Sequence, residues 1–232
     1  MKLLIDIQGC QTNSQYRGIG RYSFQIVKAI LENKEDHTII LFANGNFKDS
    51  LYKLRSEFLK YIPDENFIVF NAEFPVAEIN NENSVRCRLA EIYREKLIST
   101  IKPDAVLITS LFEGFEDNAV TSIGRTGSKP FTAVILYDLI PYLYPDPNWP
   151  PEYHSYYDKK IQSFKHAIIF FGGHFLKLPI FAFPRNLFFD RARRESPTYR
   201  ERIGDFHNGG RGTCPFFSFF GPSEDVPPPS IP

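Results

Sequence analysis

The chain has no excess of charge of either sign, because 27 lysines and arginines balance 27 aspartates and glutamates. A formal charge of zero provides no field that would collect nucleic acid or an anionic membrane, so any anion site must be local. Long apolar runs are absent too: none reaches the roughly 18 residues of a membrane span, and the apolar start, Leu3–Ile5, is too short for a signal peptide. We therefore expect neither a nucleic-acid partner nor a spanning helix.

Cysteine is scarce, with three residues at Cys10, Cys87 and Cys214. Their wide separation and odd number argue against a disulfide framework and a zinc site, and they indicate a reducing compartment. We expect a cytoplasmic protein without a bound metal. Nothing near Cys10 in the sequence marks a base that could activate its thiol, so we expect a passive small side chain there.

Strand-like and helix-like segments alternate as far as about residue 171. The apolar pattern predicts strands at Lys2–Ile7, Thr38–Phe42, Asn66–Phe70, Ala105–Ile108, Phe131–Leu136 and Ala167–Phe171. It predicts helices at Gly20–Glu32, Phe47–Tyr61, Ser84–Ile101, Glu116–Ile123 and Tyr153–His166. This alternation, without hairpin turns, is typical of an α/β protein with a doubly wound parallel sheet.

The longest predicted helix has its own expected orientation. Ser84 is expected to act as its N-cap, and Pro103 to end it. Its helical spacing is expected to turn four apolar side chains inward: Val85, Leu89, Ile92 and Leu97.

A polar loop, Asp6–Ser23, joins the first strand to the first helix. It contains Gly18 and Gly20, flanked by Arg17 and Arg21. The unpaired N–H groups at a helix N-terminus attract a phosphate or carboxylate, and glycine allows close approach. The alternative is a loop that needs its glycines only for backbone conformation, and for a lone Gly-x-Gly this alternative is favoured because the motif is weak out of context. The anion site is favoured once the loops that end at the same sheet edge are considered with it.

Ligands of doubly wound sheets bind where the strands end at their carboxyl edge. This rule selects the loop after the first strand, the segments Ser110–Gly114 and Tyr137–Pro141, and whatever follows Phe171. We expect these segments to converge.

The composition changes beyond Lys177. Lysine disappears while arginine continues, half of the 18 prolines fall in this terminal quarter, and no helical or strand period survives. One explanation is a disordered basic and aromatic tail that contacts a membrane. The other is a tail read out of frame.

The chain resembles the N-terminal domain of family 4 glycosyltransferases, in the subgroup of bacterial mannosyltransferase-like enzymes of polysaccharide and O-antigen assembly. The resemblance covers residues 1 to about 167. It is carried by four segments: Asp6–Ser23, Ser110–Gly114, Tyr137–Pro145 and Tyr156–Ala167.

This resemblance implies two facing Rossmann-like domains with catalysis in the cleft between them. It implies transfer of a sugar from a nucleotide sugar, GDP-mannose being the candidate, to a glycan or lipid-linked acceptor, with retention at the anomeric carbon. No cofactor and no Asp-x-Asp metal site are implied. Work on a lipid-linked acceptor would bring the protein to the inner face of the membrane.

Donor-binding roles also follow from the resemblance. Gly18, Ile19 and Gly20 would lie beside the donor diphosphate. Arg17 and Arg21 would add charge-assisted hydrogen bonds, although an arginine at a helix start more commonly forms a surface salt bridge.

Acceptor-side roles are implied for the later segments. Asp138 is the implied catalytic residue, which would hold an acceptor hydroxyl or support the cation-like transition state; alternatively it caps the turn before Pro141. Ser110, Glu113 and Tyr137 would bind the acceptor. The alternative for Glu113 is a solvated loop carboxylate.

One departure from the family is large. After Ala167, the motif that normally follows and the whole second domain are unrecognisable. We hypothesise a frameshift near Ala167, which would leave a Rossmann-like domain at 1–171, an irregular tail at 172–232, and a truncated enzyme with little or no activity. The alternative function is a non-catalytic carbohydrate- or phosphate-binding module of flavodoxin-like shape.

Overall fold

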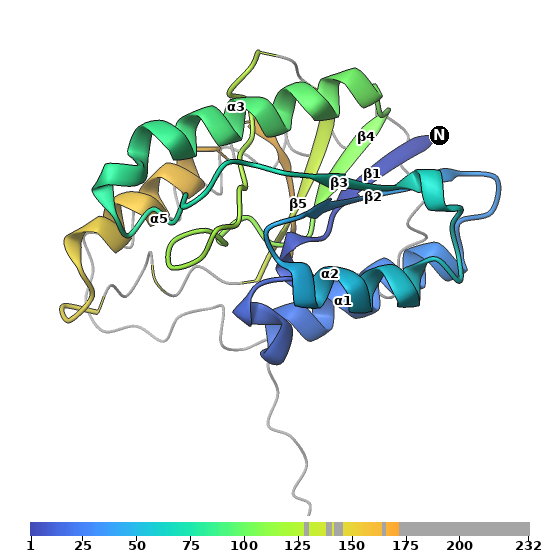
Figure 1. Cartoon of the computed structure of the whole chain (residues 1–232), viewed down its shortest axis with the longest axis horizontal. Helices are drawn as coiled ribbons and strands as arrows, with labels where there is room; N and C mark the ends of the chain where they lie inside the picture. Colours follow the sequence, from blue (N-terminus) through green and yellow to red (C-terminus); the bar gives the residue numbers. More distant parts are fainter. Residues whose placement is uncertain (128–129, 138–140, 142–145, 164–165, 172–232) are drawn as a thin grey trace, which may run out of the picture. The chain divides into compact units, whose positions relative to one another are not determined.

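A computed structural model of the chain describes residues 1–127, 130–137, 141, 146–163 and 166–171 (Figure 1). Six parallel strands form one sheet in the order β3-β2-β1-β4-β5-β6. This order reverses direction between β1 and β4, as in doubly wound folds. The predicted Rossmann-like parallel sheet is therefore confirmed.

The elements agree closely with the predicted alternation. The strands are β1 Lys2–Asp6, β2 Thr38–Asn44, β3 Phe67–Phe70, β4 Ala105–Ile108, β5 Phe131–Leu136 and β6 Ile168–Phe171. The α-helices are α1 Gly18–Glu32, α2 Lys48–Phe58, α3 Ser84–Ile101 and α5 Pro151–Ser163. Short 3-10 helices are η1 Gln8–Cys10, η2 Asn13–Tyr16, η3 Asp64–Asn66 and η4 Asn81–Asn83.

The sheet is covered on both faces. α1 and α2 lie on one face and α3 on the other (Figure 1). The central strands are accordingly apolar without alternation, as in β1, where Leu4 and Ile5 are fully buried. Phe42 and Phe70 stack at a ring separation of 4.7 Å in this core. Each such side chain contributes about 1.5–3 kcal/mol by leaving water.

The expected orientation of α3 is only partly right: Leu97 packs against the core as predicted, but Val85 and Leu89 do not face inward. Val85 and Leu89 are 69% and 61% exposed, whereas Arg94 is fully buried. Six residues of this helix are buried: Cys87, Ala90, Glu91, Arg94, Glu95 and Ile98. Charged side chains can face a protein interior when partners there satisfy them, and a hydrophobic pattern cannot register such a face. Ser84 is not the N-cap either, because Asn83 occupies that position.

The short helix expected at Glu116–Ile123 does not form. The backbone N–H of Val120 donates to the side chain of Gln8 at 2.8 Å, and Asn118 accepts from the backbone N–H of Val76 at 2.9 Å. These partners lie far away in the sequence. Tertiary hydrogen bonds therefore replace the local ones that a helix would make.

Two predictions about the rest of the chain remain untested. The tail at 172–232, and with it the proposed boundary at residue 171, lies outside the described residues. Among the helices that the structure describes, none is both long and apolar enough to cross a membrane.

Candidate functional site

The carboxyl ends of β1, β4 and β5 bring the predicted loops together. β1 pairs with both β2 and β4, so the residues that follow Asp6 meet those that follow Ile108. Tyr137 follows β5 at the same edge, where its hydroxyl contacts Ser23 of α1 and the carbonyl oxygen of Thr109, which follows β4. The convergence expected from the sequence is thus observed for these three strands.

Glu113 is a buried carboxylate at this edge, only 6% exposed. Its Oε2 atom accepts a hydrogen bond from the Thr12 hydroxyl at 2.7 Å, and its Oε1 atom accepts one from the Ser110 hydroxyl at 2.8 Å. The sequence analysis named Ser110 and Glu113 as acceptor-binding candidates but missed Thr12. Glu113 is therefore not a solvated loop carboxylate: each of its two oxygens accepts a hydrogen bond from a hydroxyl group.

Tyr137 ties α1 to the end of β4. Its hydroxyl lies 2.7 Å from the Ser23 hydroxyl, 3.0 Å from the carbonyl oxygen of Thr109 and 3.3 Å from that of Ile19. Its ring packs edge-on against Tyr22. Burial raises the pKa of the Tyr137 phenol above its ordinary value, so the hydroxyl stays protonated and can donate.

The N-terminus of α1 adjoins this hydroxyl. The helix begins at Gly18, two residues before the predicted start, and the Arg17 side chain does not cap it. Arg17 and Arg21 are exposed. The first N–H groups of a helix have no intrahelical acceptor, so this turn directs donors and positive charge outward from the sheet edge.

The two glycines of this turn serve different ends. A Cβ atom at Gly20 would overlap the backbone of Ser14 and Gln15, so glycine there is required for packing against η2. A Cβ atom at Gly18 would meet open space. The packing explanation therefore accounts for Gly20 alone, and Gly18 borders space that a ligand can enter.

A buried network of polar side chains connects α3 to the loops at this edge of the sheet. Arg94 donates to Asp6 through Nε at 2.9 Å and through Nη2, and to the carbonyl oxygen of Ser122 at 3.1 Å. The Gln8 amide donates to Asp6 at 3.0 Å and to the carbonyl oxygen of Val120 at 2.7 Å. Sequence reasoning missed this network; the one available signal was a polar pair, Asp6 and Gln8, at the end of an apolar strand.

Asn44 extends the network to β2. Its backbone and the Gln11 amide exchange hydrogen bonds of 2.8 and 2.9 Å. Its side chain donates to Gln8 and to the carbonyl oxygen of Asn118, both at 3.0 Å. The loops after three strands are therefore locked to one another by amide side chains.

Two titratable groups nearby have shifted pKa values. Burial raises the pKa of Asp117 to about 6, and the neighbouring Glu113 carboxylate adds to the shift. Burial also raises the pKa of the Cys10 thiol far above its ordinary value. A thiol that stays protonated is a poor nucleophile, in keeping with the passive role expected for Cys10.

The predicted catalytic residue, Asp138, lies outside the described residues. Its role remains a prediction that rests on the resemblance alone.

Glu78, Cys87 and Glu91 could in principle hold a metal, because their ligand atoms lie within 4.8 Å of one another. The Lys159 ammonium, however, lies 2.7 Å from Glu78 and 3.1 Å from Glu91. Burial raises the pKa of Cys87 to about 12, so its thiol is protonated. The positive charge that these carboxylates need is already supplied by a side chain.

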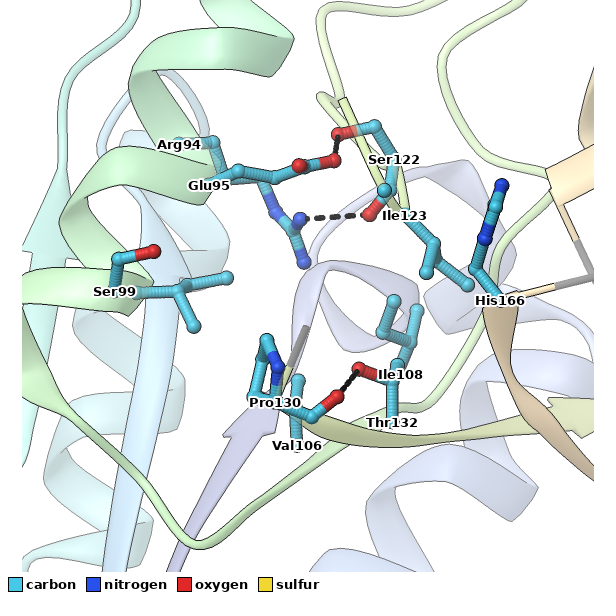
Figure 2. Close-up of a pocket in the computed structure, with 12 residues that line it drawn as sticks. Arg94, Glu95, Ser99, Val106, Ile108, Ser122, Ile123, Pro130, Thr132 and His166 are labelled. Atoms are coloured by element: carbon cyan, nitrogen blue, oxygen red, sulfur yellow. Dashed lines mark hydrogen bonds between the residues drawn. The ribbon is translucent and has the colours of Figure 1, made fainter. Parts of the chain in front are cut away.

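A small cavity of about 30 Å³ lies between α3 and the strands β4 and β5 (Figure 2). Arg94, Glu95 and His166 are among its lining residues. It has room for about one water molecule, and the buried Ser99 hydroxyl, which has no hydrogen-bond partner among the described residues, is a group that such a water could satisfy. None of the predicted site residues that the structure describes lines this cavity, and it is too small for a substrate.

The fold and the polar edge define a Rossmann-like α/β domain whose candidate site lies at the topological switch point of its sheet. The chain is 32% identical over 174 residues to a serotype-specific mannosyltransferase WbdA of Escherichia coli, which covers 74% of this chain and 21% of that relative. Two further Escherichia coli proteins of the same name are 30% and 29% identical over 147 residues, covering 62% of this chain and 18% of each relative.

The resemblance to bacterial mannosyltransferases that the sequence suggested is thus confirmed. The chain spans about a fifth of the length of the curated relatives it matches. No protein-family model and no solved structure matches it.

Proposed function

We propose that this chain provides the acceptor-side domain of a retaining glycosyltransferase, which transfers mannose from GDP-mannose to a glycan or lipid-linked acceptor. The similarity to proteins named mannosyltransferases supports the reaction class. One structural observation carries the assignment of the site. The buried carboxylate of Glu113, held by two hydroxyls, shares the carboxyl edge of the sheet with the open N-terminus of α1.

In this proposal, the first turn of α1 binds the donor diphosphate. The N–H groups of Gly18, Ile19 and Gly20 oppose the negative charge that grows on the phosphate oxygen as the bond to the sugar breaks. Arg17 and Arg21, both exposed beside this turn, add charge-assisted hydrogen bonds. Together they offset the charge without a metal ion.

The acceptor lies on the other side of the edge. Glu113 and Ser110 orient an acceptor hydroxyl, and Tyr137 fixes the approach of α1 to β4. Asp138 supports the positive charge that develops on the sugar ring. The acceptor oxygen bonds to the anomeric carbon as the phosphate departs, and the hydroxyl proton passes to the departing phosphate.

Catalysis in this proposal requires a second wall that holds the nucleotide. Residues 172–232 differ in composition from the rest of the chain, and we propose that a frameshift near Ala167 separates them from the ancestral frame. The 232-residue chain should then bind an acceptor but turn over slowly or not at all. Sequencing the gene tests this point: the downstream nucleotides must encode a second Rossmann-like domain in another frame, and their failure to do so refutes the frameshift.

Binding by isothermal calorimetry tests the site itself. The chain is expected to bind α-linked mannosides, and Glu113→Gln should weaken that binding about tenfold because a charged acceptor contributes roughly 1.5–3 kcal/mol. Glu116→Gln, an exposed residue of the same segment, is the matched control and should leave the affinity unchanged. Binding of neither mannosides nor GDP-mannose would refute the proposed function.

A transfer assay in the presence of EDTA separates the proposal from a non-catalytic binding module. The chain alone is expected to transfer mannose slowly or not at all. When a nucleotide-binding domain from a relative is added, the proposal expects metal-independent transfer that Glu113→Gln reduces. A module would bind the glycan and transfer nothing, even when a nucleotide-binding domain from a relative is added.

A further inference from the structure

A chain of aromatic rings runs from the interior to the surface beside the candidate site. Tyr156 and Phe115 are buried, with ring centres 5.3 Å apart. Phe115 meets Tyr153 edge-on at 4.9 Å, and Tyr153 meets Trp149 edge-on at 4.9 Å. Tyr153 and Trp149 are only partly buried. The outer two rings therefore present aromatic surface to solvent.

This aromatic chain is attached to the loop that carries Glu113. The Tyr156 hydroxyl donates to the backbone carbonyl oxygen of Glu113 at 2.6 Å. The backbone N–H of Ile79 donates to the carbonyl oxygen of Phe115 at 2.9 Å, and the Ile79 side chain is 41% exposed. Apolar surface thus continues outward from the segment that holds the buried carboxylate.

Trp149 is held in place by a hydrogen-bonded turn. Its backbone N–H donates to the carbonyl oxygen of Asp146 at 3.0 Å, and the Asp146 carboxylate accepts from the backbone N–H of Asn148 at 2.8 Å. The ring of His154 lies 6.1 Å from the indole. A fixed indole with polar groups around it matches a ligand that has an apolar face and a polar rim.

We propose that Trp149 and Tyr153 form a platform that binds one pyranose ring of an oligosaccharide acceptor, beyond the sugar unit that reacts. A pyranose presents C–H groups on one face and hydroxyls on its rim. Amphipathic aromatic side chains at a half-exposed site bury the C–H face of the sugar and leave its hydroxyl groups in water. This inference rests on the proposed function, because it assumes that the acceptor lies against Glu113.

The platform makes length the basis of acceptor selection. A monosaccharide can occupy the reacting position or the platform, whereas an oligosaccharide reaches both. We therefore expect α-linked mannotetraose to bind about tenfold more tightly than methyl α-mannopyranoside, a difference of about 1.4 kcal/mol, because only the longer ligand also buries a ring face on the platform.

The chain offers a direct probe, because Trp149 is its only tryptophan. Titration of the full chain with mannotetraose should change the tryptophan emission with the same midpoint as calorimetric binding. By calorimetry, Trp149→Ala and Tyr153→Ala should each lower the affinity about tenfold, an effect that one lost ring contact explains. Tyr153→Phe, which keeps the ring, should stay within about twofold of the unchanged chain.

Two controls separate binding from folding. Tyr52→Ala removes a ring that is 71% exposed on α2 and should leave the affinity unchanged. Trp149→Phe keeps an aromatic face and should retain most of the affinity. If Trp149→Ala does not fold, Tyr153→Ala and the change in tryptophan emission still test the platform. Thermal melts of each variant identify any that unfold.

The outcomes distinguish the platform from the proposed function. Calorimetric binding that Glu113→Gln weakens, but that leaves the tryptophan emission and the affinities of the Trp149 and Tyr153 variants unchanged, overturns the platform and leaves the proposed function standing. A chain that binds no mannoside of any length overturns both.

Discussion

The helices on the two faces of the sheet bury different kinds of side chain. On one face, α1 contributes Val27 and Ile30, each at most 1% exposed. On the other face, α3 contributes apolar side chains to the core as well, but it also buries three charged ones, Glu91, Arg94 and Glu95. Figure 1 shows these helices on opposite faces of the same strands. The stabilisation from apolar contact depends on the area buried and has no preferred direction, whereas each buried charged side chain needs an oppositely charged or hydrogen-bonding partner at a defined position.

The two helices are also connected to the candidate site by different contacts. Arg94 binds Asp6, and Asp6 and the backbone of Val120 both bind the Gln8 amide. On the α1 side, the links to the site are the hydrogen bonds of the Tyr137 hydroxyl with Ser23 and Ile19 and the close packing of Gly20 against η2. The α3 face thus positions the loops at the carboxyl edge through buried charge, and the α1 face does so without an ion pair among these contacts.

Removing a buried charge from the α3 face should lower the free energy of unfolding more than any other change considered. Arg94→Met leaves the Asp6 carboxylate buried without its ion pair, which costs about 3–5 kcal/mol. Urea unfolding followed by circular dichroism measures this cost. A second variant, Asp6→Leu with Arg94→Met, removes both charges and should recover part of the loss. If Arg94→Met alone were as stable as the unchanged chain, the Arg94–Asp6 ion pair would contribute little to the free energy of unfolding.

Truncating an apolar side chain on α1 should cause the next largest loss of stability, and the same truncation on α3 provides the comparison between the helices. Ile30→Ala in α1 should cost about 2–4 kcal/mol, because the side chain is buried and leaves a cavity. Leu89→Ala in α3 should cost less than about 0.5 kcal/mol, because that side chain is 61% exposed. The sequence pattern, which turns Leu89 inward, predicts for Leu89→Ala the loss that a buried leucine would give. Equal measured losses would mean that α3 is oriented as the pattern suggested.

The same contrast explains how far the sequence could lead. The strands β4 and β5 match their predicted bounds residue for residue, because strands buried on both faces are continuous apolar runs. α1 was found by its apolar spacing. The face of α3 was not, because the burial of Arg94 depends on Asp6, 88 residues away in the chain. Periodicity within one segment carries no record of such a partner.

The candidate site divides in a similar way. The rule that ligands lie at the carboxyl ends of parallel strands predicts from the sequence that Ser110, Glu113 and Tyr137 share one edge of the sheet. Thr12 and Gln8 were missed, because their roles depend on side-chain hydrogen bonds across loops. Topology fixes which loops meet, and only packing fixes which atoms meet.

A smaller effect should follow from the link on the α1 side. Tyr137→Phe removes the hydroxyl that contacts Ser23 and Thr109 while keeping the ring. The expected cost is about 1–2 kcal/mol, the penalty for one buried hydrogen bond left unmade. Thermal melting measures it. Tyr16→Phe, at an exposed ring, is the control. A loss of mannoside affinity with no loss of stability would instead assign the hydroxyl to the acceptor.

The smallest effect concerns pH and the loop on the α3 side. Because burial raises the pKa of Asp117 to about 6 from 3.8, the folded chain holds a proton that the unfolded chain has released between about pH 4 and pH 6. The contribution of this group to the free energy of unfolding therefore falls as the pH rises through that range. Asp117→Asn keeps an oxygen that can accept from the backbone N–H of Ala119 and cannot become charged. It should stabilise the chain at pH 8 by on the order of 1 kcal/mol and leave its stability at pH 4 nearly unchanged. Melting curves across this range measure the difference, with the exposed Asp36→Asn as control. A stabilisation that persists at pH 4 would point to packing, because at that pH the carboxyl in the folded chain is already neutral.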